Sequence, residues 1–189
     1  LPAWEHNLFQ DLEMNYDCYT IIDMVTQFDP AYNDINAHLL NVSDGSAFDD
    51  SMSFGWSISL PDGTRIATCS GSAPGSKQSS FRAEGYGMLS LVRFIHHLSV
   101  FCHSQPQWKI KLICDNEGLL IRIEKTLTWT YLQPNVTLRS EWDIKSVILN
   151  TYKNIRWKFE FQHVKSHQDD SLPVHSLPLA VQLNIKADR

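Results

Sequence analysis

The sequence predicts an α/β fold: a mixed five-stranded sheet, in which three antiparallel strands are followed by parallel strands, flanked by helices. Three observations predict it. Strand-like segments come first, at residues 39–43, 54–60 and 64–70. The short turn Pro61-Asp62-Gly63 joins the second and third of them into an antiparallel hairpin. After residue 80, helical and strand-like patterns alternate, as expected when crossover helices cover a partly parallel sheet.

The first strand is predicted from the apolar residues between Leu39 and Ser43, and it is expected to end at Asp44-Gly45-Ser46. In the hairpin, side chains of residues 64–70 alternate between apolar or small and more polar types, which is typical of a strand. The stretch 71–79 is rich in Gly, Ser and Pro, so it is predicted to be a loop.

Two further strands and four helices are predicted in the second half of the chain. Apolar residues recur at steps of three and four from Ser80 to about Val100, which predicts a long helix. Lysines alternate with apolar residues from Trp108 to Cys114, which predicts a strand. The remaining elements are a helix over 117–127, a helix over 140–152, a strand over 157–164 and a helix from Leu179 to the end.

The N-terminal segment differs from the rest in charge. All Lys and Arg residues follow residue 40, whereas residues 1–40 contain seven acids. Because this segment also lacks a clear period, we expect residues 1–37 to be an acidic connector or the tail of a preceding domain, and 38–189 to form the domain. The chain does not begin with Met, so we expect an internal piece of a longer polypeptide, with its last helix truncated at Arg189.

Composition excludes several classes of protein. A hydrophobic content of 43% permits a core, and no apolar run approaches the ~18 residues of a membrane span. The start, Leu1 to Glu5, lacks the pattern of a signal peptide. The four cysteines form no closely spaced pair, which favours free thiols in a reducing compartment. We therefore expect an intracellular protein, cytoplasmic or nuclear, that is not secreted and has no membrane partner.

Three acids occupy positions that this fold would bring together. Asp44 follows the first strand, Asp115 follows the fourth, and Glu84 lies in the first turn of the long helix. If the first and fourth strands are neighbours, Asp44 and Asp115 lie side by side at the sheet edge. Clustered carboxylates repel one another unless cations neutralise them, and oxygen ligands select Mg²⁺ or Mn²⁺. Each acid taken singly also fits a surface residue or a helix cap.

Five short motifs then occur in order. They are Ser43-Asp44-Gly45-Ser46, Phe81-Arg82-Ala83-Glu84-Gly85, Cys114-Asp115-Asn116, His163-Val164-Lys165-Ser166-His167 and Asn184-Ile185-Lys186-Ala187-Asp188. With them, residues 39–189 resemble a type I ribonuclease H domain, most closely those of retroelement reverse transcriptases.

The resemblance implies an endonuclease that hydrolyses the RNA strand of RNA–DNA hybrids with two Mg²⁺ ions, for which Mn²⁺ can substitute. It implies a reverse transcriptase domain in the same polypeptide as a partner. The implied metal ligands and catalytic acids are Asp44, Glu84, Asp115 and Asp188, and His167 would assist proton transfer or product release. Residues expected to contact nucleic acid are Gly45, Ser46, Ser80, Asn116, Lys165 and Asn184.

The sequence departs from the family in two respects that bear on substrate binding. Bacterial-type relatives have a pair of Asn residues before the Arg-x-Glu motif, where this chain has Ser80-Phe81. We find no separate segment of clustered Lys, Arg and Trp between the helices; the basic residues Lys145, Lys153, Arg156 and Lys158 are a sparse substitute. Trp129 and Tyr131 either stack on nucleic acid or fill the edge of the core.

Two other functions compete with the nuclease. One is a non-catalytic spacer or nucleic-acid-binding module of the same fold. The other is a transposase- or integrase-type strand transferase, which would need an acid near Asn150, where the sequence has none.

Overall fold

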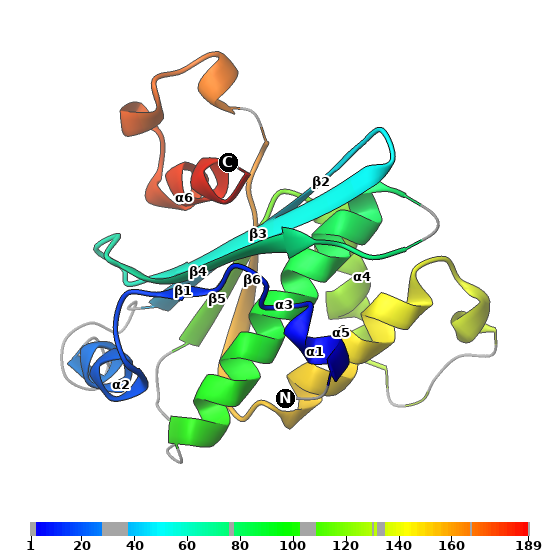
Figure 1. The fold of residues 1–189 in the computed structure, drawn as a ribbon, viewed down its shortest axis with the longest axis horizontal. Coiled ribbons are helices and arrows are strands. Elements are labelled where there is room, and N and C mark those ends of the chain that lie inside the picture. The colour runs from blue at the N-terminus through cyan, green and yellow to red at the C-terminus, as the bar shows by residue number, and fades with distance from the viewer. Residues whose placement is uncertain are drawn as a thin grey trace.

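A computed structural model of the protein describes residues 3–27, 38–75, 78–102, 109–129, 131, 135–166 and 168–188. Its centre is one six-stranded sheet in the order β1-β4-β3-β2-β5-β6 (Figure 1). The strands are β1 (Glu13–Met14), β2 (His38–Phe48), β3 (Ser51–Ser59), β4 (Arg65–Ser72), β5 (Lys109–Cys114) and β6 (Lys158–His163). The helices are α1 (Ala3–His6), α2 (Cys18–Gln27), α3 (Ser80–Cys102), α4 (Glu117–Leu127), α5 (Trp142–Asn154) and α6 (Leu179–Asp188), with short 3₁₀ turns at Val136–Leu138, Gln168–Asp170 and Val174–Ser176.

The predicted mixed sheet is confirmed. Strands β2, β3 and β4 pair antiparallel in sequence order, β5 runs parallel to β2, and β6 runs parallel to β5. The sixth strand, β1, pairs antiparallel with β4 at the sheet edge. With only two residues it is too short to show a period, so no pattern in the sequence predicts it.

Strand β2 does not end at Asp44, as the sequence suggested. Asp44 pairs with Gly55 of β3, and this ladder continues to Phe48. What ends early is the parallel pairing with β5, whose last pair is Val42 with Ile113. The polar and small residues after Ser43 resemble a turn in composition, but the antiparallel neighbour holds them in strand geometry.

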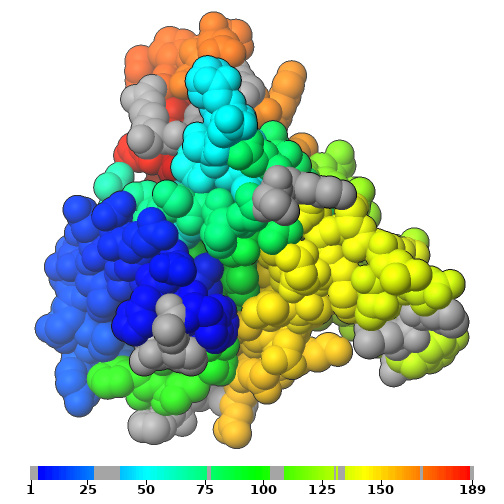
Figure 2. Space-filling model, turned by 45° about the vertical axis from the view of Figure 1, so that its right-hand side comes forward, coloured from blue at the N-terminus to red at the C-terminus, as the bar shows by residue number. Residues whose placement is uncertain are grey.

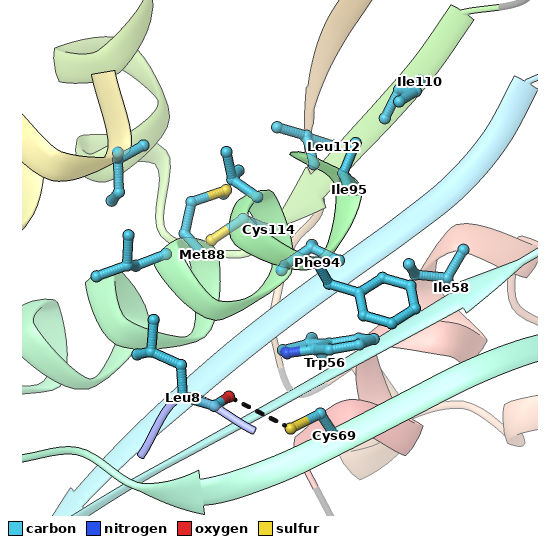
Figure 3. Close-up of a cluster of buried hydrophobic side chains, with 14 of the residues drawn as sticks. Leu8, Trp56, Ile58, Cys69, Met88, Phe94, Ile95, Ile110, Leu112 and Cys114 are labelled. Atoms are coloured by element: carbon cyan, nitrogen blue, oxygen red, sulfur yellow. Dashed lines mark hydrogen bonds between the residues drawn. The ribbon is translucent and has the colours of Figure 1, made fainter. Parts of the chain in front are cut away.

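Helices cover both faces of the sheet (Figure 1). On one face, α3, α4 and α5 enclose the larger hydrophobic cluster, in which Trp56 packs against Phe94 (Figure 3). The Trp56 indole nitrogen donates to Ser90 Oγ at 2.6 Å. On the other face, α6 covers a smaller cluster around Val42 and Ile113. Within the described residues, no helix is long and apolar enough to cross a membrane.

Residues 3–27 pack against this domain and form part of its surface (blue in Figure 2). Ile21 of α2 is fully buried in the larger cluster, together with Leu8. The buried carboxylate of Glu5 pairs with Arg93 Nε at 2.5 Å and with His97 Nε2 at 2.9 Å, both on α3. The predicted boundary at residue 38, and the role of residues 1–37 as a connector, stay predictions; the packing adds that the segment also contributes to the core.

Replacing Ile21 by alanine should destabilise the protein by about 2–5 kcal/mol, because the change removes fully buried methyl and methylene groups. Asp23→Ala on the same helix is the matched control, since Asp23 is exposed, and it should change stability by less than about 0.5 kcal/mol. Urea unfolding of both variants measures the difference. Equal stabilities would mean that α2 does not pack on the domain in solution.

Candidate functional site

The strand pairing brings two of the predicted acids to the same edge of the sheet. The parallel pairing of β2 with β5 ends at Val42 and Ile113, so Asp44 lies two residues beyond the last pair on β2 and Asp115 comes directly after β5. The start of α3 reaches this edge because residue 45 is a glycine. A Cβ at Gly45 would lie 2.3 Å from the backbone of Ala83 and from the Glu84 nitrogen, so any side chain there would push α3 away.

Glu84 is the most perturbed carboxyl group of the site. It is 5% exposed, and ligand atoms of Glu84, Cys114 and Asp115 all lie within 4.8 Å of one another. Burial, and then the negative charges of Asp115 and Asp44, raise the pKa of Glu84 to about 10. Without a cation, Glu84 therefore holds a proton at neutral pH.

Cys114 belongs to this cluster, although no role was predicted for it. Its thiol donates to Glu84 Oε2 at 3.6 Å, and its sulfur accepts from the Asn116 N–H at 3.3 Å. Burial raises the pKa of the Cys114 thiol well above its usual value, so it stays protonated. The thiol therefore helps to orient the Glu84 carboxyl. The sequence shows only that Cys114 ends an apolar strand beside Asp115, which does not indicate this contact.

The Asp115 backbone is held on two sides. The Asn116 side chain caps α4 by accepting from the Leu119 N–H at 2.9 Å. His163 Nε2 lies 3.0 Å from the Asp115 carbonyl oxygen, and because a carbonyl only accepts, Nε2 carries the proton. Asp115 Oδ1 is buried and has no hydrogen-bond partner among the described residues. A buried acceptor beside a second carboxyl group fits a cation, and its oxygen chemistry suits Mg²⁺ or Mn²⁺.

Asp44 completes the charged cluster from the β2 side. It is 6% exposed, and its Oδ1 accepts from the Gly45 N–H at 2.7 Å. Asp44 lines a pocket together with Ser46 and with Ala187 near the end of α6. A Cβ at Gly55 of β3 would lie 2.3 Å from the Ala187 carbonyl oxygen, so this glycine admits α6 to the sheet.

The structure describes one of the two remaining predicted catalytic residues in part and the other not at all. The backbone of Asp188 is the last residue of α6 and follows Ala187, but its side chain lies outside the described part of the structure. His167 lies outside the described residues altogether.

The residues predicted to contact nucleic acid fall into different environments. Ser46, Ser80 and Lys165 are exposed, and Gly45 is partly exposed beside Asp44. Asn116 is partly exposed, and its side-chain oxygen Oδ1 accepts the capping hydrogen bond of α4.

Asn184 is buried, at 5% exposure, and its Oδ1 has no partner among the described residues. The predicted contact of Asn184 with nucleic acid stays a prediction. Its burial on α6 is compatible with a role in placing the end of that helix.

The comparisons with known proteins concern the fold. No family model and no curated protein matches the sequence. A solved structure of LC11-RNase H1, isolated from compost by a metagenomic approach, matches with a TM-score of 0.51 at 15% sequence identity, covering 80% of this chain and 90% of that chain. The chain has the ribonuclease H-like fold.

Another structure of this fold, RNase H1 from the halophilic archaeon Halobacterium salinarum, gives a TM-score of 0.46 at 14% identity over 70% of this chain and 89% of that chain. The fold explains why the acids of β2, α3 and β5 meet. It also accounts for the predicted order of three antiparallel strands followed by parallel ones.

Proposed function

We propose that the protein is a metal-dependent endonuclease that hydrolyses the RNA strand of RNA–DNA hybrids. One observation carries the proposal: in a ribonuclease H-like fold, Glu84 and Asp115 lie together in a buried cluster, and the charge of Asp44 reaches it. Repelling carboxyl groups in a buried site are unfavourable unless a cation is bound. The LC11 neighbour, an RNase H1 by name, suggests the class of reaction.

The proposed metal ligands are Asp44, Glu84 and Asp115, with Asp188 added from the sequence resemblance. Two bound Mg²⁺ or Mn²⁺ ions would stabilise charge on the attacking and leaving oxygens of a phosphodiester. The surrounding residues hold the ligands in place: the Gly45 N–H fixes Asp44, the Cys114 thiol contacts Glu84, and His163 fixes the backbone of Asp115. A bound cation would take the place of the proton that Glu84 otherwise holds.

Substrate contacts are proposed for exposed residues around these ligands. Ser46 lies two residues beyond Asp44, and Ser80 begins the helix that carries Glu84. Their hydroxyl groups can hydrogen-bond to a ribose 2′-hydroxyl, the group that distinguishes RNA from DNA. Lys165 offers a charge to a phosphate, and the resemblance assigns proton transfer or product release to His167.

We also propose that the chain is the ribonuclease H part of a retroelement polypeptide and works beside a reverse transcriptase domain. The five motifs and their order support this, because they resemble the domains of such polypeptides. The domain would then act on the hybrid made by its partner domain.

The test is cleavage of a labelled RNA–DNA hybrid in Mg²⁺, with double-stranded RNA and double-stranded DNA as controls. We expect cleavage of the RNA strand of the hybrid alone, and a loss of more than about 100-fold in Asp115→Asn, since even outer-shell changes reduce metal-site activity by roughly 10–100-fold. Asp23→Asn, an exposed acid on α2, should retain full activity. Unchanged cleavage in Asp115→Asn would refute the proposal. Binding of the hybrid without cleavage would favour the non-catalytic module.

A further inference from the structure

A second polar site, which the nuclease proposal does not use, is a pocket between the end of α4 and the start of α5. Arg122 and Lys125 line it from α4, and Arg139 and Lys145 line it from the segment that leads into and forms α5. This part of the molecule is on the right of Figure 2, in yellow-green and yellow. Among the described residues that line the pocket there is no acid. Basic residues that are scattered in the sequence are thus gathered around one cavity.

Lys145 is the unusual member of this group. It is only 6% exposed, whereas a lysine normally keeps its charged end in water. No described acid forms an ion pair with its ammonium group. The two nearest candidates in sequence, Glu141 and Asp143, pair instead with Arg82, at 2.6 and 2.9 Å. Burial, followed by the charges of Arg122 and Arg139, lowers the pKa of Lys145, and the charges of Glu141 and Asp143 offset only part of this effect. The net effect of this environment disfavours the charged form of the lysine, and a bound anion would stabilise it.

Aromatic side chains complete the pocket. Trp129 and Trp142 line it, and both are partly buried. The Arg139 guanidinium lies over the Trp129 ring, 5.9 Å from its centroid. Cations beside flat aromatic faces suit a ligand that carries both a phosphate and a base, because a base stacks on an aromatic ring in any sequence.

We propose that this pocket binds the terminal phosphate of a nucleic-acid strand, with the terminal base against its tryptophans. An internal phosphodiester carries one negative charge, whereas a terminal phosphomonoester carries about −1.5 to −2 at pH 7. Four cationic side chains without a lining acid match the larger charge. This site does not contain the carboxylates of the candidate metal centre, and its binding does not depend on cleavage.

The test uses single-stranded DNA oligonucleotides with a 5′-phosphate, a 3′-phosphate or neither, each labelled at the other end or internally. We expect an oligonucleotide with a terminal phosphate to bind at least about tenfold tighter than the one without, roughly the effect of one charge-assisted hydrogen bond. Inorganic phosphate and a free nucleoside monophosphate serve as competitors. Stronger competition by the monophosphate than by inorganic phosphate would indicate that the base also contributes to binding. We expect the phosphorylated strand to bind more tightly than the unphosphorylated strand.

The decisive variant is Lys145→Met, which removes the charge and keeps an unbranched apolar chain in the buried position. Its matched control is Lys153→Met on the exposed side of the same helix. We expect the preference for a terminal phosphate to disappear in Lys145→Met and to persist in Lys153→Met. Arg139→Gln, a change at an exposed residue, provides a second variant that should reduce the preference even if Lys145→Met folds poorly.

Asp115→Asn separates this inference from the nuclease proposal, because it should abolish cleavage and leave the preference intact. Equal binding of strands with and without a terminal phosphate would overturn the inference. So would an unchanged preference in both Lys145→Met and Arg139→Gln.

Discussion

Replacing Glu84 by glutamine should stabilise the metal-free protein and at the same time abolish metal-dependent cleavage. The folded-state pKa of Glu84, about 10, lies above its ordinary value of 4.5, so between these values the folded chain holds a proton that the unfolded chain releases. The free energy of unfolding therefore falls as pH rises through this range. Glutamine fills the same space without a titrating proton, so the variant avoids this loss.

Thermal unfolding from about pH 5 to about pH 9, without divalent metal, measures the effect. The melting temperature of Glu84→Gln should exceed that of the wild type by an amount that grows with pH. Glu117→Gln, an exposed acid at the start of α4, should show no such trend. Adding Mg²⁺ should stabilise the wild type more than Glu84→Gln, because only the wild type retains the Glu84 carboxylate that would bind the metal ion. A difference that is constant with pH would contradict the assigned burial of Glu84.

Replacing Gly45 by alanine should remove most of the activity through the backbone rather than through a catalytic group. The added Cβ would lie 2.3 Å from the backbone of Ala83 and from the Glu84 nitrogen, which no rotamer can relieve. Strand β2 or the start of α3 must shift, so Asp44 and Glu84 separate. We expect a destabilisation of about 1–3 kcal/mol, as in other overpacked sites, and a loss of metal-dependent cleavage that exceeds what this change in stability explains.

The control for this prediction is Gly118→Ala on α4, where the nearest atom to an added Cβ is Asn116 Oδ1 at 3.4 Å. An alanine there should stabilise the helix by about 0.5–1 kcal/mol and leave cleavage unchanged. Urea unfolding and hybrid cleavage by the two variants give the comparison. Full activity in Gly45→Ala would mean that β2 and α3 do not approach as closely as described.

The sheet was predictable because apolar residues tend to recur at every second position in strands and at steps of three and four in helices. The Pro61-Asp62-Gly63 turn fixed the hairpin, and in the structure the Leu60 N–H donates to the Thr64 carbonyl across it at 2.9 Å. The neighbouring positions of Asp44 and Asp115 also followed from strand order. By contrast, the continuation of β2 beyond Asp44 depends on its pairing with β3, and composition does not report such pairing.

Features that depend on tertiary contacts were not predictable. The N-terminal segment looked like a solvated acidic stretch, yet Glu5 is buried because Arg93 and His97 lie opposite it on α3. Lys145 appeared to be one of a few scattered bases, whereas the fold places it with Arg122 and Arg139. In each case the partner lies far away in sequence, so local patterns cannot reveal the pair.

The candidate site shows the same division. The sequence singles out Asp44 and Asp115 by their places beside predicted strands and Glu84 by its place at the start of a helix, and the structure brings the three acids near one another. The contribution of Cys114 could not be predicted, since a buried cysteine at the end of a strand is usually only part of the core. The contact with Glu84 arises because β5 and α3 pack together at that residue.

The central claim is that Asp44, Glu84 and Asp115 form a divalent-metal site. Anomalous diffraction from crystals of the protein soaked in Mn²⁺ tests it most directly, with crystals of Glu84→Gln treated identically. We expect anomalous density beside Glu84 and Asp115 in the wild type, within coordination distance of Asp44, and its loss or clear weakening in the variant. A wild-type crystal that shows no density among these carboxylates, or shows it unchanged in Glu84→Gln, would contradict the claim.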